Sequence, residues 1–270
     1  YGRVSRYGLI AMASSLDQIG PFATTVADAA LMLQVIEGVD DRDATTVQLP
    51  STTLPELLNK SIQGLKIGVP KEYFIDGMDE EVRARVLESI EKLKELGAEI
   101  VEVSLPLTPY ALPAYYIIQP AEASTNLERL DGMRFGTRAQ SPNLLESYLQ
   151  SRGDGFGPEV KRRIMLGSFI LSAGYFDAYY KKAQAVKTAI YQEMMDVFKH
   201  VDVIVTPTSP CVAWNLGERF EDPIAMYLAD IFTVTANIAG LPGISVPCGL
   251  AHNLPVGLQF IGPYLGDDKV

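Results

Sequence analysis

The amino-acid sequence predicts an α/β fold, and three observations support this prediction. Of the 270 residues, 47% are apolar and 21% are charged, which is the composition of an ordinary globular protein. Strand-like apolar runs alternate with helix-like amphipathic segments along the chain. Residues 65–103 follow the order strand, helix, strand, which predicts a βαβ-like unit with a right-handed crossover.

The N-terminal part predicts one strand, one helix and one long loop. Residues 8–14 are a short apolar run, typical of a buried strand. Thr25 and Asp28 have the spacing of a capping box, so we expect a helix to start there and to end before Gly38. Residues 40–55 are polar and predict a loop. The apolar face expected for the helix consists of Val26, Ala29, Ala30, Leu33 and Ile36.

The strand–helix–strand unit has clear start and stop signals. Residues 65–69 predict a strand that Pro70 stops. Asp79 is expected to cap a helix that runs to about residue 96 and ends at Gly97. Residues 98–103 predict the second strand.

The middle of the chain predicts mainly helices. One helix is expected over residues 113–130, with Pro113 in its first turn. Residues 132–157 contain five glycines and predict a flexible stretch, interrupted by a short helix at 144–150. Pro158 starts a helical region to residue 200, with a bend near 172–174.

The C-terminal part returns to strands. Residues 201–205 predict a buried strand, and residues 224–239 predict a helix that ends at Gly240. Residues 243–247 and 256–262 predict the last two strands.

Charge and cysteine content exclude several classes of protein. The net charge is −10, so a nucleic-acid-binding face is not expected, because phosphate binding needs a basic surface. No apolar run approaches the roughly 20 residues that span a bilayer, so no membrane association is expected. The two cysteines, Cys211 and Cys248, cannot form a disulfide framework, which predicts a cytoplasmic protein.

The sequence contains no motif typical of a metal site, a nucleotide-binding site or a serine hydrolase. His200, His252 and the cysteines lack the spacing of zinc ligands, and no G-x-S-x-G elbow occurs. Ser89 and Lys92 fit S-x-x-K, but they lie on the charged face of an ordinary amphipathic helix. We therefore expect no metal site.

Two charged positions stand out. Arg162 and Arg163 come near the start of a helix, where anions are favoured, so they are either solvated or one of them binds a carboxylate. Asp230 is flanked by apolar residues, which indicates either an exposed polar face or a partner for its charge.

Several strings resemble the amidase signature family, and the resemblance covers essentially the whole chain. The general strings are YGRVSRYG (1–8), SSLDQIGP (14–21), DAA (28–30), GLPGISVP (240–247) and GLQ (257–259). Others narrow the resemblance to the A subunits of glutamyl-tRNA(Gln) amidotransferases: PAEAS (120–124), EVKRRIMLG (159–167) and GYFDAYYKKAQ (174–184).

The resemblance implies a mixed central β-sheet surrounded by helices. It also implies a Ser–Ser–Lys triad, with lysine as the base and one serine as the nucleophile. In the family these residues precede the string at Tyr1, so residues 1–270 are expected to be part of a single amidase domain. The N-terminal catalytic portion and the C-terminal end are expected to be missing. No catalytic residue is therefore expected in this chain, which alone should be inactive.

By the same resemblance, the chain carries residues that bind glutamine. Arg163 would bind the α-carboxylate and Asp230 the α-ammonium group. Arg162 remains an alternative to Arg163. Either Tyr115 or Tyr116 would also approach the substrate.

The implied function is hydrolysis of glutamine to supply ammonia for converting Glu-tRNA(Gln) to Gln-tRNA(Gln). The expected partners are the B and C subunits, with tRNA bound through the complex. The chain itself is expected to hold no cofactor, and ATP and Mg²⁺ would be used by the partner subunit. The alternatives are a free-standing amidase acting on small amides and a catalytically dead scaffold.

Overall fold

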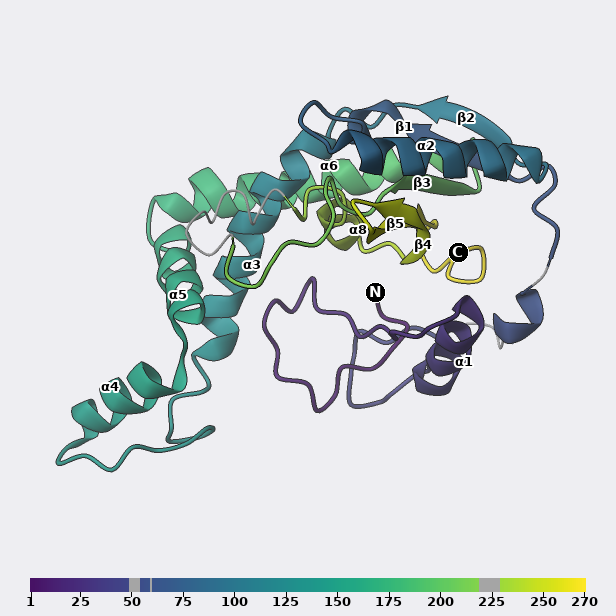
Figure 1. The fold of residues 1–270 in the computed structure, drawn as a ribbon. Coiled ribbons are helices and arrows are strands. Elements are labelled where there is room, and N and C mark those ends of the chain that lie inside the picture. The colour runs from purple at the N-terminus through teal and green to yellow at the C-terminus, as the bar shows by residue number, and fades with distance from the viewer. Residues whose placement is uncertain (49–53, 59, 219–228) are drawn as a thin grey trace. The chain divides into compact units, whose positions relative to one another are not determined.

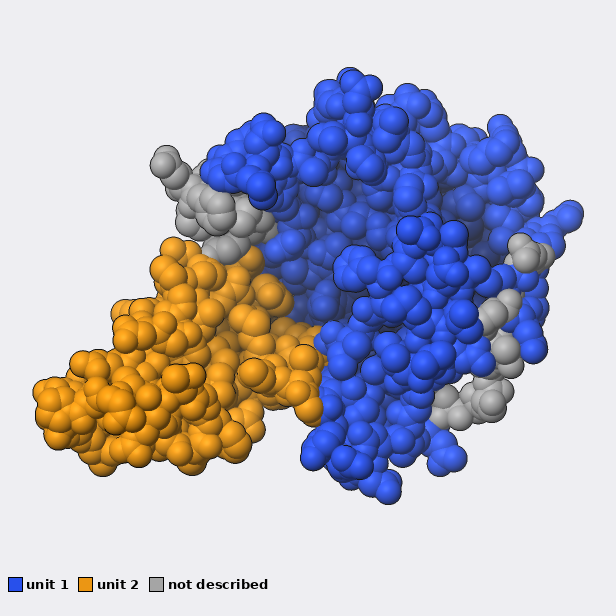
Figure 2. Space-filling model, turned by 60° about the horizontal axis from the view of Figure 1, so that its bottom comes forward, with its two compact units in different colours: residues 1–7, 18–112, 187–270 blue, residues 8–17, 113–186 orange. Residues whose placement is uncertain are grey.

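The computed structural model describes residues 1–48, 54–58, 60–218 and 229–270. The chain divides into two compact units, shown in Figure 2: unit 1 contains residues 1–7, 18–112 and 187–270, and unit 2 contains residues 8–17 and 113–186. Helices α3 (Ala111–Leu127) and α6 (Lys181–Val197) each include residues of both units. The expectation of a single amidase domain over residues 1–270 stays a prediction.

Unit 1 contains a five-stranded mixed sheet, which confirms the predicted fold class (Figure 1). The strand order is β2-β1-β3-β5-β4. Strand β1 pairs in parallel with β2 and β3, whereas β5 pairs antiparallel with β3 and β4. The strands are β1 (Lys66–Pro70), β2 (Glu99–Val103), β3 (Val203–Pro207), β4 (Gly243–Ala251) and β5 (Leu254–Ile261).

The predicted strand–helix–strand unit is confirmed. The Asp79 carboxylate accepts hydrogen bonds from the N–H groups of Glu81 (2.9 Å) and Val82 (3.2 Å), and so caps α2 (Glu80–Glu95). Helix α2 packs against β2, β3, β4 and β5, and its buried apolar stripe contributes to the core of unit 1. Gly97, at a φ of 99°, ends the helical segment in a conformation that suits glycine.

The last two strands are longer than the sequence predicts. They form a hairpin whose two turn residues, His252 and Asn253, have φ angles of 50° and 63°. Positive φ at both central positions is typical of a type I′ turn, which usually contains glycine. The hairpin was missed because neither residue is glycine.

Helix α1 (Val26–Ile36) starts where predicted, because the Thr25 hydroxyl accepts a hydrogen bond from the N–H of Asp28 (3.1 Å). No residue of α1 is buried. On the predicted apolar face, Ala29, Ala30 and Leu33 are partly buried, whereas Val26 and Ile36 are exposed. As predicted, the helix ends before Gly38, which has a φ of 140°; its C-cap residue is Glu37, in an extended conformation. The main chain of Glu37 forms an isolated bridge with Val4, which takes the chain away from the helix axis.

The strand predicted at residues 8–14 does not form. The Asp17 carboxylate accepts hydrogen bonds from the N–H groups of Met12 (2.8 Å) and Ala13 (3.0 Å). These N–H groups therefore close a local loop instead of pairing with another strand.

Unit 2 is helical. Helix α4 (Leu144–Gly155) is capped by Asn143 and extends beyond the expected 144–150, so Gly153 and Gly155 are helical rather than part of a flexible loop. The region after Pro158 divides at the expected bend into α5 (Pro158–Ile170), a π-helical turn (Phe176–Tyr180) and α6. Helix α3 begins slightly before Pro113 and ends before residue 130.

The remaining helices of the described chain are short. Helix α8 (Val234–Ala239) ends at Gly240, as predicted. Residues 229–233 form turns rather than the expected helix, and residues 224–228 lie outside the described residues. The 3₁₀ turns are Leu54–Leu57, Lys71–Tyr73 and Thr108–Tyr110. None of the helices described is both long enough and apolar enough to cross a membrane.

Candidate functional site

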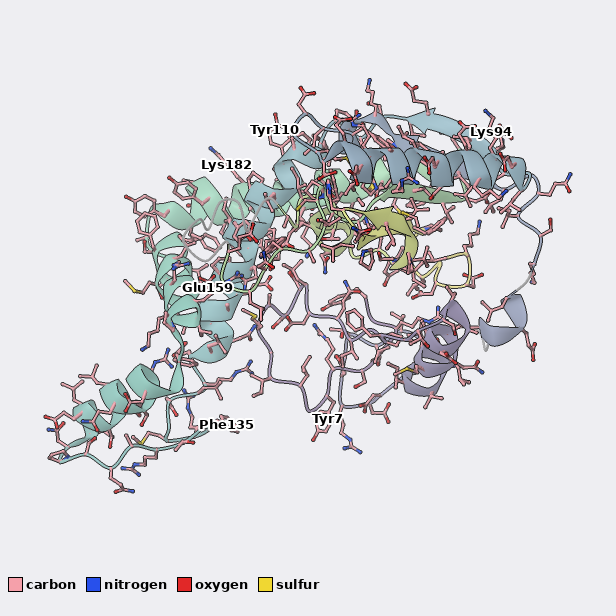
Figure 3. The ribbon with its side chains drawn as sticks, in the orientation of Figure 1. Tyr7, Lys94, Tyr110, Phe135, Glu159 and Lys182 are labelled. Carbon is pink, nitrogen blue, oxygen red and sulfur yellow. The ribbon has the colours of Figure 1, made fainter. Side chains whose placement is uncertain are left out.

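Arg163 lies on α5, on the side that faces α3. Its Nη1 donates a hydrogen bond to Oε1 of Gln119 on α3, at 2.6 Å. Its Nε donates to Oε1 of Glu159, one turn earlier on α5, at 2.8 Å. Only 18% of the Arg163 side chain is exposed, and Glu159, labelled in Figure 3, is about half exposed. The guanidinium is therefore held by groups from two helices.

The charge of Arg163 is stable. Burial lowers the pKa of its guanidinium, but hydrogen bonds to Glu159 and Tyr115 raise it, and the net effect is a pKa above the ordinary value. Arg163 thus remains a cation at every physiological pH.

Both candidate tyrosines contact Arg163, in different ways. Tyr115 lies close enough to the guanidinium to raise its pKa. The Tyr116 ring lies 5.9 Å from the guanidinium carbon, within cation–π range. The two rings pack edge to face, with their centroids 5.1 Å apart. Both therefore flank the cation, and which of them approaches the substrate stays a prediction.

Arg162, the alternative to Arg163, occupies a different environment. It pairs with Oε2 of Glu159 at 2.6 Å, and 57% of its side chain is exposed. Arg162 and Glu159 thus form an exposed ion pair one turn apart on the same helix. This is the solvated environment that the sequence allowed for one of the two arginines. Of the two arginines, Arg163 is the one drawn toward α3.

The approach of α5 to α3 depends on Gly167, one turn after Arg163. A Cβ atom at Gly167 would lie 1.9 Å from the carbonyl oxygen of Pro120 and 2.8 Å from Cβ of Ser124. The two backbones thus meet directly, beside Gln119. Pro120 lies inside α3, where it lacks the N–H of an ordinary helical residue.

Asp230 belongs to unit 1, whereas Arg163, Tyr115 and Tyr116 belong to unit 2. It is exposed, in the turn before α8. Its main-chain carbonyl accepts hydrogen bonds from the N–H groups of Thr233 (3.0 Å) and Val234 (3.1 Å). The backbone of Asp230 thus helps to start α8, and the pairing of its carboxylate with glutamine stays a prediction.

Unit 2 also contains a pocket of about 290 Å³ beside α3. The Glu122 carboxylate accepts a hydrogen bond from the N–H of Ser15 (2.9 Å). The Asn126 amide donates to the Met12 carbonyl (3.1 Å) and to the Ser14 hydroxyl (2.9 Å). These two side chains, one turn apart, tie the 8–17 loop to α3. The lining residues are Ser14, Ala121, Glu122, Thr125, Asn126, Leu171, Phe176 and Tyr180.

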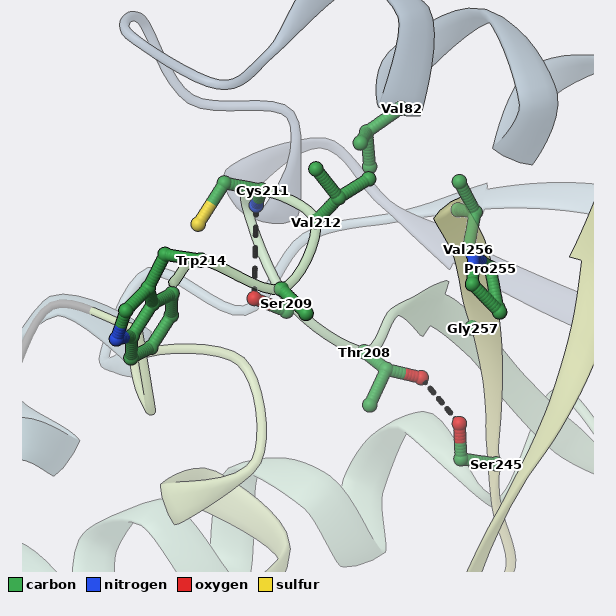
Figure 4. A pocket seen from close by; sticks show the side chains of 11 residues that line it. Val82, Thr208, Ser209, Cys211, Val212, Trp214, Ser245, Pro255, Val256 and Gly257 are labelled. Atoms are coloured by element: carbon green, nitrogen blue, oxygen red, sulfur yellow. Dashed lines mark hydrogen bonds between the residues drawn. The ribbon is translucent and has the colours of Figure 1, made fainter. Parts of the chain in front are cut away.

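Unit 1 holds a larger pocket, of about 460 Å³, shown in Figure 4. The Thr208 and Ser245 hydroxyls share a hydrogen bond of 2.7 Å in its wall, and Trp214 also lines it. Among the residues that the structure describes, those lining the pocket include hydroxyls and a thiol but no charged side chain. These described residues can bind a neutral group by hydrogen bonds.

Sequence reasoning missed the residues that hold the candidate site together. Gln119, Glu122 and Asn126 all lie on α3. The only sequence signal was their presence in and beside the string at 120–124. In the described parts of the chain, no group of three or more His, Cys, Asp or Glu side chains could hold a metal ion.

Comparisons with known proteins identify close relatives. The chain is 57% identical over 262 residues to the A subunit of the glutamyl-tRNA(Gln) amidotransferase of Chloroflexus aggregans, covering 97% of this chain and 54% of the relative. It is 58% identical over 263 residues to the protein of the same name from Fusobacterium nucleatum, with the same coverage.

Comparison with solved structures finds proteins of the same kind. The crystal structure of the A subunit of the Thermotoga maritima glutamyl-tRNA(Gln) amidotransferase superposes with a TM-score of 0.81 at 44% identity, covering 100% of this chain and 54% of that one. A crystal structure of an amidase matches with a TM-score of 0.74 at 24% identity, which supports the fold alone.

The chain thus spans about half the length of the relatives it matches. The sequence pattern of the amidase family matches residues 1–270. This match agrees with the strings at both ends of the sequence and with the mixed sheet of unit 1. The chain belongs to the amidase family.

Proposed function

We propose that this chain is part of the glutamine-hydrolysing A subunit of a tRNA-dependent amidotransferase. The identity of 57–58% to proteins of that name supports the proposal. The structural observation that carries it is the half-buried Arg163 cation, held between α5 and α3. A free-standing amidase is less well supported, because the amidase structure matches at only 24% identity.

The role of this chain in the proposed reaction is recognition of glutamine. Among the described residues, Gln119 and Glu159 each accept a hydrogen bond from one of the five N–H groups of Arg163, which leaves donors for the α-carboxylate of the substrate. Asp230 would supply the anion for the α-ammonium group. By family resemblance, the Ser–Ser–Lys triad that attacks the amide lies outside residues 1–270.

The released ammonia would pass to a partner subunit that amidates Glu-tRNA(Gln). We propose the B and C subunits as partners, with ATP and Mg²⁺ used by the partner rather than by this chain. With a net charge of −10, the tRNA contacts fit better on the partner subunits. A cytoplasmic location accords with this role in translation.

The test replaces Arg163 in the full-length subunit, assembled with its partners. Arg163→Ala should raise KM for glutamine roughly ten- to a hundred-fold, because it removes a charge pair with the bound substrate. Amidation driven by added ammonia should be spared, since that route bypasses glutamine. Arg162→Ala, at the preceding residue of the same helix, is the matched control and should leave both routes unchanged.

Equal loss of both routes in Arg163→Ala would assign Arg163 to folding and contradict the proposal. The same comparison tests the anionic group: Asp230→Asn should impair glutamine use much more than hydrolysis of an amide that lacks the α-amino group.

A further inference from the structure

We infer that Gln119 is a positioning residue for the glutamine site: it aims the Arg163 guanidinium at the substrate carboxylate. The inference rests on the proposed role of Arg163. It concerns a side chain on a different helix, 44 positions away in sequence.

The contact itself is short and buried. Oε1 of Gln119 accepts a hydrogen bond from Nη1 of Arg163 at 2.6 Å. Gln119 is only 2% exposed, so water does not compete for its amide. A charge-assisted hydrogen bond in such a place is stronger than one at the surface.

The orientation of the Gln119 amide follows from chemistry. A guanidinium has only donors, so the amide oxygen must face it, and the NH₂ group must point elsewhere. Among the residues that the structure describes, the buried Nε2 of Gln119 has no hydrogen-bond partner. A buried amide donor without an acceptor opposes folding.

The unpaired amide donor indicates that Gln119 has a functional role as well as a structural one. An apolar side chain of similar length would remove the unpaired donor but would also leave Nη1 of Arg163 without this acceptor, so the two effects on stability oppose each other. The benefit of the amide is its hold on Arg163. Unpaired buried polar groups of this kind concentrate where function requires them.

Without Gln119, Arg163 would lose its short hydrogen bond to α3. Tyr115 and Tyr116, also on α3, would still flank the guanidinium. Glu159, the other side chain that accepts a hydrogen bond from it, lies on the same helix as Arg163 and is about half exposed. Arg162, which pairs with that carboxylate, is mostly exposed to solvent. The direct backbone contact of Pro120 with Gly167 fixes the position of Gln119 relative to α5. Gln119 therefore keeps the guanidinium against α3, beside Tyr115 and Tyr116.

The neutrality of the amide also matters. A glutamate at position 119 would accept the same hydrogen bond, but its charge would compete with the substrate carboxylate for the guanidinium. Glutamine holds the cation without neutralising it.

The test uses the full-length subunit in its complex and measures KM and kcat for glutamine, ammonia-driven amidation and Tm. Gln119→Met should raise KM about ten-fold, the effect of losing one hydrogen bond to a charged group, with kcat within about two-fold. Its Tm should fall less than that of Gln259→Met, because removing the unpaired donor offsets part of the lost hydrogen bond. Ammonia-driven amidation should be intact. Gln119→Glu should raise KM further, because its carboxylate occupies the guanidinium.

Gln259→Met is the matched control for stability. Gln259 is equally well buried, but its Nε2 donates to Thr206 (2.8 Å) and to the Phe232 carbonyl (3.0 Å), so this variant should lower Tm. If Gln119→Met lowered Tm as Gln259→Met does and left KM unchanged, Gln119 would be structural and the inference wrong. Arg163→Ala separates the two proposals: with KM unchanged in that variant, the proposed function fails as well.

Discussion

His252 shows how a single residue joins two elements of unit 1. It lies in the β4–β5 turn, and its Nε2 is 2.8 Å from the Asp79 carboxylate that caps α2. Its main-chain N–H donates to the Glu81 carboxylate, also at 2.8 Å. The hydrogen bond to Asp79 and the charges of both carboxylates raise the pKa of His252 above its ordinary 6.5. The bond to His252 in turn lowers the pKa of Asp79 below 3.8.

This contact should depend on pH in a defined direction. Because the folded pKa of His252 is raised, its stabilising effect is complete below about 6.5 and is lost as the pH rises through the folded value. The pKa of Asp79 is lowered, so its contribution is present above about 3.8 and is lost as the pH falls through its folded value. The hairpin should therefore be held most firmly between about pH 4 and 6.5.

An NMR titration of the His252 ring checks this prediction. We expect a midpoint above 6.5 that returns toward 6.5 in Glu81→Gln and Asp79→Asn. A midpoint of His252 that both substitutions leave unchanged would mean that the carboxylates do not act on the ring in solution.

At the scale of elements, the packing of α5 on α3 depends on the absence of a side chain at Gly167. The Cβ of an alanine would overlap the Pro120 carbonyl oxygen at 1.9 Å, and backbone cannot move aside as a flexible side chain can. Gly167→Ala should destabilise unit 2 by about 2–3 kcal/mol, the usual effect of overpacking. It should also raise KM for glutamine in the assembled enzyme, because Gln119 and Arg163 would be displaced.

Gly153→Ala is the matched control. Gly153 is also helical, in α4, but apart from its own helix backbone no described atom lies within 4 Å of the Cβ position. Alanine there should stabilise the helix by roughly 0.5–1 kcal/mol. Thermal or urea unfolding of both variants measures the difference. Similar effects from the two substitutions would contradict the backbone contact.

Short-range signals predicted the elements whose stabilising groups are close in sequence. Thr25 and Asp79 cap the starts of α1 and α2 by bonding N–H groups two or three positions away. Gly97 and Gly240, both with positive φ, lie at the ends of α2 and α8. The strand at 8–14 failed because the apolar pattern does not reveal where N–H groups bond. Here the Asp17 side chain takes them.

The sequence predicted the charged residues of the candidate site but not the contact that positions them. The charge and position of Arg163 and Asp230 drew attention within the sequence, and the family resemblance assigned their roles. Gln119 is a polar residue in an apolar helix, with its partner far away in sequence. No local pattern indicates such a contact. It requires the helix packing that Gly167 allows.

At the scale of the whole molecule, one exposed apolar surface lies on and before α1. Phe22 is 98% exposed, Val35 76% and Leu31 54%. The helix is apolar around most of its circumference, yet none of its residues is buried. Monomeric soluble proteins rarely leave such a surface uncovered. Its presence therefore predicts association with another polypeptide, or with itself when no other is present.

We expect the 270-residue chain, studied alone, to self-associate through this surface. The net charge of −10 opposes association, so raising the salt concentration should strengthen it by screening the repulsion. The double variant Leu31→Glu, Val35→Glu should weaken association at least about ten-fold, since each apolar side chain loses its burial in the contact. Sedimentation velocity over a range of protein and salt concentrations measures both effects. Leu87→Glu, a similar change at an exposed leucine on α2, supplies the control for added charge. If the control weakened association as much, or if the unaltered chain stayed monomeric in high salt, the α1 surface would not be the cause.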